Sequence, residues 1–206
     1  IAQKEPNRED IESSAETLPR PEKLFNAELN YSHQFKKQFV VHATGFLMYY
    51  LDQLVLTGKI NDVGAYTRTN IAKSYRAGIE LQGKAVITNW MNLAANFTFS
   101  ENKIKNFTEY LDDYDNGGQQ IKFYPKTTIS FSPSVIAGGS INFIPVKNAA
   151  ISLLSKYVGR QYLDNTAQKS RSLSAYYLQD IRLSYLITHK IFKETNVILQ
   201  LNNVFN

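Results

Sequence analysis

Hydrophobic and polar residues alternate along most of this chain, and the alternation predicts β-strands. It is longest in the segment 127–144, where from Ile129 to Phe143 the odd positions are mostly apolar and the even positions are Ser, Asn or Gly, with Ile136 as the exception. Successive side chains of a strand point to opposite faces, so this strand has one apolar and one polar face. A turn at 145–148 and renewed alternation over 148–160 predict a long hairpin.

Eight such segments occur, joined by alternately short and long connections. The expected strands are residues 24–33, 38–50, 71–86, 91–101, 127–144, 148–160, 173–187 and 195–204. The long connections, expected to be loops, are residues 51–70, 102–125 and 161–172. Residues 1–22 are polar and contain three prolines, so we expect a long loop or arm there. Short turns at one end and long loops at the other are typical of an antiparallel outer-membrane barrel.

The apolar face is compatible with more than one all-β architecture. In a soluble sandwich or a lipocalin-like barrel it would cover an internal core, whereas in an outer-membrane barrel it would face lipid and the polar face would line the lumen. Aromatic residues lie near both ends of the apolar faces. An example is the pair Phe39 and Tyr49, at the two ends of one expected strand. At about 3.3 Å per residue and a tilt near 45°, that pair spans roughly 23 Å, close to the apolar band of about 25 Å in such barrels. The spacing favours the membrane barrel.

Charge and composition narrow the function further. The net charge of +5 comes from scattered basic residues, which does not indicate a nucleic-acid partner. Cysteine is absent, so no disulfide or thiolate site is expected. No apolar run reaches the roughly 18 residues that a transmembrane helix needs, and the N-terminal residues lack the pattern of a signal peptide. The expected polar face carries charges of both signs: Glu28, Arg76, Glu80, Lys84, Lys156, Arg160, Asp180 and Arg182.

No motif predicts catalysis, a cofactor or a metal site. The histidines His33, His42 and His189 are isolated and lack the spacing of a zinc site. The acidic segment 112–118 could hold calcium, but it fails the EF-hand pattern and a solvated loop at the rim of a barrel is the preferred interpretation. The chain is therefore not expected to be an enzyme.

Four strings in this sequence resemble the C-terminal part of the barrel of TonB-dependent outer-membrane receptors, of the type common in Bacteroidetes. The strings are EPNRED (5–10), DQLVLTGKINDVGAYTRTNIAKSYRAGIE (52–80), KYVGRQYLDNT (156–166) and LNNVFN (201–206). The resemblance implies about eight strands of a larger, 22-stranded barrel, truncated at both ends. It also implies an N-terminal plug domain, absent here, through which the TonB complex would act in the outer membrane of a Gram-negative cell.

The function implied by the resemblance is import of a scarce nutrient, with a ferric siderophore or other extracellular iron chelate as the first expectation. Cobalamin, haem or a glycan would be compatible with the same fold. A small structural or adhesive eight-stranded outer-membrane barrel is an alternative of another class. Outer-membrane lipid is an expected partner of either.

Candidate ligand residues lie in or beside the expected long loops, where charge-assisted hydrogen bonds or stacking could hold an anionic or aromatic ligand. They are Arg68, Arg76, Asp113, Asp115, Arg160, Tyr162 and Asp164. The resemblance further implies that Glu5, Asn7 and Arg8, from the EPNR string, order a loop.

Overall fold

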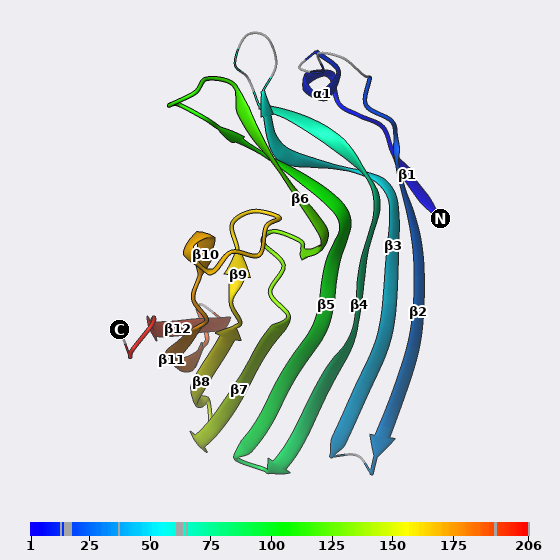
Figure 1. Ribbon diagram of the computed structural model, residues 1–206. Helices are drawn as coiled ribbons and strands as arrows, with labels where there is room; N and C mark the ends of the chain where they lie inside the picture. Colours follow the sequence, from blue (N-terminus) through cyan, green and yellow to red (C-terminus); the bar gives the residue numbers. More distant parts are fainter. Residues whose placement is uncertain are drawn as a thin grey trace.

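The computed structural model describes residues 1–12, 14, 18–36, 38–60, 64, 66–191 and 193–205, and most of these lie in antiparallel strands (Figure 1). The long strands are β2 (Glu22–Phe35), β3 (Phe39–Ile60), β4 (Tyr66–Thr88), β5 (Met91–Asp112), β6 (Gln119–Thr128), β7 (Val135–Val146), β8 (Ala149–Val158), β11 (Tyr176–His189) and β12 (Lys193–Leu201). The short elements are β1 (Ala2–Lys4), α1 (Arg8–Glu12), β9 (Gln161–Tyr162), a 3-10 helix (Lys169–Arg171) and β10 (Ser172–Leu173).

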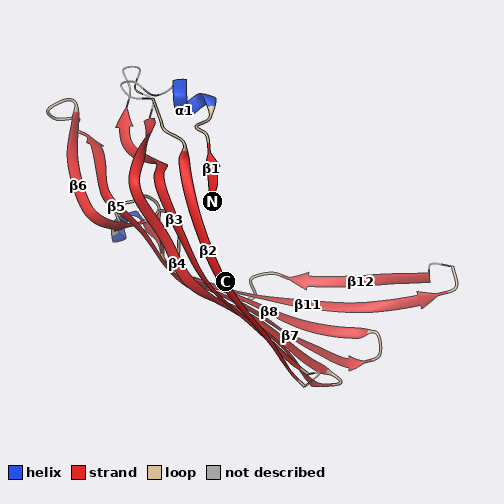
Figure 2. Cartoon of the chain, turned by 90° about the vertical axis from the view of Figure 1, so that its right-hand side faces the viewer, coloured by secondary structure: helices blue, strands red, loops and turns tan. Residues whose placement is uncertain are grey.

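The strands form one open, bent sheet. Their order is β1-β2-β3-β4-β5-β7-β8-β11-β12, with β6 paired to the distal part of β5. Nearly every neighbour in this order is also a neighbour in sequence, which is the up-and-down topology expected of a barrel segment. Strands β1 and β12 end the order, and among the described residues they do not pair with each other, so this sheet is not closed (Figure 2).

Two of the expected long loops are extended hairpins instead. Strands β3 and β4 are 22 and 23 residues long, and they pair through Leu56 and Arg68 within the segment expected as the loop 51–70. The expected loop 102–125 is likewise the end of β5 paired with β6. Cross-strand hydrogen bonds satisfy the backbone polar groups of these segments, which irregular loops of this length would leave to water. A strand of 22 residues spans about 73 Å, far more than a membrane requires.

The expected single strand 127–144 is two strands. β6 ends at Thr128 and β7 begins at Val135, and both pair with β5. Between them Phe131 has φ +50, and its amide donates to the Tyr162 carbonyl oxygen at 2.8 Å. A residue with positive φ interrupts the strand geometry. The hydrogen-bonded strand therefore stops here, although the alternation of apolar and polar residues in the sequence continues.

The polar termini and loops are also more structured than expected. The arm 1–22 contains β1, which pairs with β2 through Ala2 and Leu24, and the helix α1. The expected loop 161–172 contains β9 and the 3-10 helix, and its β9 and β10 form a two-stranded sheet.

The two faces of the sheet differ in polarity. Leu29, Gly45, Ile79, Phe99 and Val135 lie directly opposite one another along one cross-strand row and therefore share a face. We call this side the apolar face. Leu29 is 78% exposed, and Ile79 and Phe99 are each 54% exposed. Such a row of exposed apolar side chains suits lipid.

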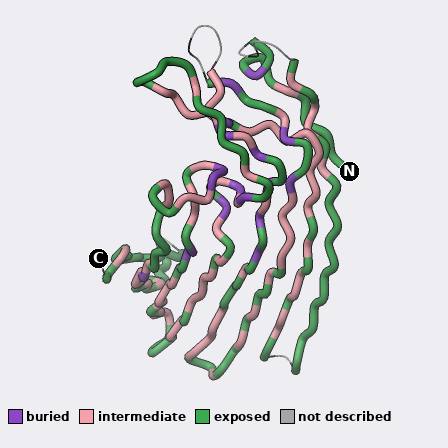
Figure 3. The backbone as a smooth tube through the Cα atoms, in the orientation of Figure 1, coloured by how far each residue is buried: buried purple, intermediate pink, exposed green. Residues whose placement is uncertain are grey.

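Burial is concentrated away from that row, in the distal parts of β3 to β6 and in the 159–175 segment (Figure 3). Only five hydrophobic side chains are buried among the residues described here, and four of them form one cluster: Ile71, Ile104, Phe107 and Ile129. Within the described chain, no helix has the length and hydropathy needed to cross a membrane.

Candidate functional site

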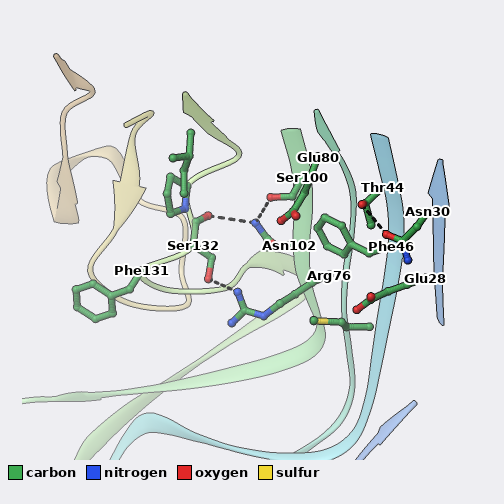
Figure 4. A pocket seen from close by; sticks show the side chains of 13 residues that line it. Glu28, Asn30, Thr44, Phe46, Arg76, Glu80, Ser100, Asn102, Phe131 and Ser132 are labelled. Atoms are coloured by element: carbon green, nitrogen blue, oxygen red, sulfur yellow. Dashed lines mark hydrogen bonds between the residues drawn. The ribbon is translucent and has the colours of Figure 1, made fainter. Parts of the chain in front are cut away.

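A pocket of about 540 Å³ lies on the polar face and contains Arg76 (Figure 4). Strands β2 to β5 supply one wall and the break between β6 and β7 supplies the other. Its residues are Glu28, Asn30, Thr44, Phe46, Met48, Arg76, Glu80, Ser100, Asn102, Phe131, Ser132, Pro133 and Ile136. The strand residues are all at even positions, so strand alternation alone brings these side chains to one face.

Arg76 is held by the strand break rather than by a carboxylate. Its Nη1 donates to Ser132 Oγ at 2.7 Å, and Asn102 Nδ2 donates to Ser100 Oγ at 2.9 Å beside it (Figure 4). Among the described residues, Arg76 makes no ion pair, although Glu28 and Glu80 line the same pocket. A guanidinium has five N–H donors, so most of those of Arg76 remain available to an anion.

A second pocket, of about 720 Å³, also includes Arg76. Its other cations are already paired: Lys4 Nζ lies 3.7 Å from Glu22 Oε1, Arg68 Nη1 lies 3.3 Å from Asp10 Oδ1, and Arg171 Nη2 lies 2.6 Å from Glu109 Oε1. Arg76 is thus the guanidinium shared by both pockets, and it is the one without a carboxylate partner in the described parts of their walls.

Arg171 ties the 159–175 segment to the sheet. Its Nη2 lies 2.6 Å from Glu109 Oε1 and its Nη1 lies 2.9 Å from Asp164 Oδ2. Tyr124 donates to Glu109 Oε2 at 2.8 Å, and Gln168 donates to Tyr124 Oη at 3.1 Å. Burial opposes the charge on Arg171, but the hydrogen bond to Glu109 and the two nearby carboxylates outweigh it and raise the pKa of Arg171.

The arm is joined to β4 through Asp10. Asn7 Oδ1 accepts the Asp10 amide at 2.7 Å and Asp10 Oδ2 accepts the Asn7 amide at 3.0 Å, a reciprocal cap for α1. Arg68, a predicted ligand residue, instead pairs with this buried carboxylate. Glu5 accepts a hydrogen bond from Gln3, and Arg8 Nε lies 2.6 Å from Glu12 Oε1 on the exposed side of α1.

The acidic segment 112–118 forms the turn between β5 and β6. Asp113 accepts hydrogen bonds from Gln120 Nε2 at 2.8 Å and from Asn116, and these bonds lower the pKa of Asp113. Asp115 is exposed. No group of three or more potential metal ligands occurs among the residues that the structure describes.

The structure separates the candidates into different environments. Arg160 donates to Ser172 Oγ at 3.2 Å, and the carbonyl of Tyr162 accepts the amide of Phe131 at 2.8 Å. Asp164 also accepts the Thr166 amide at 2.9 Å. Thus Arg68, Arg76 and Asp164 border the second pocket, whereas Asp113 and Asp115 lie in the β5–β6 turn that follows Asp112, a residue of the pocket wall.

Sequence reasoning missed Glu109, Arg171 and Ser132 as members of this region. Glu109 lies in a segment that was expected to be a loop. The positive φ of Asn106 (+54), just before it, also changes which side of the sheet the following side chains of β5 face. Only the long-range contacts identify these residues, since no local pattern in the sequence marks them.

A family model described as "TonB dependent receptor-like, beta-barrel" matches residues 10–206 of the chain. No curated protein sequence matches it.

Solved structures resemble the chain in fold over nearly its whole length. They include the ferric-catecholate import receptor Fiu from E. coli K12 (17% identity, TM-score 0.61); the match covers 100% of this chain and 26% of the Fiu chain. The ferric yersiniabactin uptake receptor FyuA from Yersinia pestis has 20% identity and a TM-score of 0.63, with 90% of this chain and 25% of its own covered. The copper transporter OprC has 11% identity and a TM-score of 0.70, with 99% and 30% covered. The chain therefore spans about a quarter to a third of the length of these proteins.

Proposed function

Because this chain belongs to the TonB dependent receptor-like β-barrel family, we propose that it is part of an outer-membrane transporter that imports a scarce nutrient. The chain is not an enzyme, since its family is one of receptors for transport. The family match is the observation that supports this function most strongly. The exposed apolar face and the open sheet agree with a segment that continues into a larger barrel.

The proposal includes the rest of that barrel. An upstream plug domain would lie against the polar face and contact the TonB complex, and the source would be a Gram-negative cell of the Bacteroidetes type. The open edges at β1 and β12 weigh against a small, closed eight-stranded barrel. The gene that encodes the intact protein should therefore encode a plug and further strands, and a stop codon immediately after this segment would contradict the proposal.

The proposed ligand is an anionic iron chelate, such as a ferric siderophore. Arg76 supports this choice because its guanidinium lies between two pockets on the polar face without a carboxylate partner among the described residues. Pockets of about 300–1,000 Å³ are the usual size for small ligands. The two fold relatives named as ferric receptors make iron chelates the first ligands to test.

Arg76→Gln in the intact receptor should weaken binding of an anionic ferric chelate by about tenfold or more, the usual worth of a charge-assisted hydrogen bond. The matched control is Lys84→Gln, which removes a cation from the same strand and the same face outside both pockets. Binding is measured by tryptophan quenching and uptake with radioactive iron in cells. Equal affinity of the two variants for the chelate would show that Arg76 is not part of the binding site. Uptake of haem, cobalamin or a glycan, but of no iron chelate, would contradict the proposed ligand class.

A further inference from the structure

Four lysines gather on the apolar side of the sheet, at the distal end of its exposed hydrophobic band. Lys73 lies directly opposite Lys105, Lys105 lies opposite Lys126, and Tyr75 lies opposite Lys103. Directly opposed residues share a face, so these side chains lie on the same side as Tyr75. We call Lys73, Lys103, Lys105 and Lys126 the lysine patch.

The contacts within the lysine patch support this placement. Lys126 Nζ lies 3.1 Å from Glu101 Oε1 and 5.7 Å from the centre of the Tyr75 ring. The Tyr75 hydroxyl donates to Glu101 Oε2 at 3.0 Å, and Lys103 Nζ donates to Thr128 Oγ1 at 3.0 Å. These bonds join β4, β5 and β6 into one surface.

The charge of the lysine patch is poorly balanced. Glu101 is the carboxylate that pairs with it, so four lysines and one glutamate leave a net charge of +3. Like charges directly opposed across strands are destabilising, and Lys73, Lys105 and Lys126 form two such pairs in succession. Lys105 and Lys126 are exposed, as is Lys73. An external anion would relieve this repulsion.

The residues next to the lysine patch indicate where it lies relative to the exposed apolar band. Moving along β5 from Glu101 toward its short turn, the next two residues on the same face are Phe99 and Phe97, which are 54% and 41% exposed. On β4, Tyr75 is followed on that face by Ala77 and Ile79. The cations thus begin where the apolar band ends, behind an aromatic residue, which is the arrangement of a membrane interface.

We propose that the lysine patch is a binding surface for the phosphate headgroups of anionic lipids in the leaflet on the long-loop side of the membrane. Its continuity with the exposed apolar band favours a lipid over a soluble acidic protein, because a lipid offers acyl chains to Phe99 and a phosphate to the lysines at once. The inference rests on the membrane placement proposed above but not on the transported ligand.

Lipid selectivity of the intact receptor in neutral detergent tests this inference. The receptor is titrated with phosphatidylglycerol or with zwitterionic phosphatidylcholine, and bound lipids are counted by native mass spectrometry. The wild type should prefer phosphatidylglycerol, with each lysine contributing about fivefold at low ionic strength. The variant K73Q/K103Q/K105Q/K126Q should lose the preference. High salt should weaken the lipid preference of the wild type, because the electrostatic screening length falls to about 3 Å at an ionic strength of 1 M.

Two control variants sharpen the test. K84Q/K156Q removes two lysines of the polar face and should keep the wild-type preference, whereas E101Q removes the anion beside Lys126 and should increase it. A thermal midpoint in detergent confirms that each variant is folded, and phosphatidylglycerol should raise it for the wild type but not for the fourfold variant.

An unchanged preference in the fourfold variant would overturn the inference. So would tighter binding of soluble polyglutamate than of phosphatidylglycerol, because that result would assign the lysine patch to an acidic protein. A receptor that is folded and monomeric without detergent would instead overturn the membrane placement itself. Iron-chelate uptake is read separately in the same variants and should be unaffected, so failure of the ligand proposal is distinguishable from failure of this one.

Discussion

Gly78 shows how closely β4 approaches its neighbours. A Cβ at this position would lie 2.3 Å from the Phe99 carbonyl oxygen and 2.9 Å from Phe46 Cζ, so glycine lets the Phe46 ring cover the strand. A Cβ at Gly138 would similarly meet Asn96 Oδ1 at 2.6 Å. Gly78 and Gly138 therefore allow close packing inside these strands.

Gly78→Ala should destabilise the receptor by about 1–3 kcal/mol, because the backbone contact with Phe99 cannot be relieved by a rotamer change. The control is Gly45→Ala, since nothing lies within 4 Å of a Cβ at that position. Thermal and denaturant midpoints in detergent measure the difference. Equal midpoints for the two variants would show that β4 and β5 can separate without cost.

At the scale of elements, the 159–175 segment is attached to the distal half of β5 mainly through Arg171. The side chain of Glu109 is only 5% exposed, so removing its cationic partner leaves a carboxylate in a poorly hydrated position. The Leu163 amide donates to the Arg171 carbonyl at 2.9 Å, which closes the segment on itself. An ion-pair network with one buried carboxylate therefore helps to order this loop, beside the hydrogen bonds that join it to the break between β6 and β7.

Arg171→Gln should loosen that segment locally by roughly 2 kcal/mol, about thirtyfold in amide exchange rate at the Leu163 amide. Lys169→Gln, an exposed change in the same 3-10 helix, is the control and should leave exchange unchanged. Hydrogen exchange with mass spectrometry measures both. Loss of protection throughout the sheet in Arg171→Gln would show instead that the network supports the whole fold.

At the scale of the molecule, exposed apolar surface dominates. The side chains of one face are largely exposed along β2 to β5, and the described part of the chain has a single small cluster of buried hydrophobic residues. In water, a chain with such an exposed apolar face and two unpaired sheet edges would aggregate.

Residues 1–206 should therefore form strand structure and a discrete particle only in detergent, and should aggregate in plain buffer. Circular dichroism and size-exclusion chromatography in both conditions make the comparison. A folded, monodisperse monomer in plain buffer would mean that the apolar face is an internal core, and the outer-membrane assignment would then be wrong.

Much of the fold could be predicted from the sequence because the signal is local. A period of two residues sets which side chains share a face, so the alternation around Phe97 and Ile79 predicted an antiparallel sheet with one apolar side, and the family match and the structure confirm that fold class. The short turns also follow from local residues. The sequence by itself thus determined the antiparallel β class and the two faces of the sheet.

Only the tertiary structure decided where pairing continues and which charges remain free. Alternation predicted one strand through Phe131, whose positive φ breaks it, and irregular loops where β3 to β6 pair to their ends. Arg68 and Arg76 are equivalent cations in the sequence, but Asp10, 58 residues away, pairs with the first and leaves the second available. Such outcomes depend on hydrogen bonds and ion pairs between distant segments, and these form only when the chain is folded.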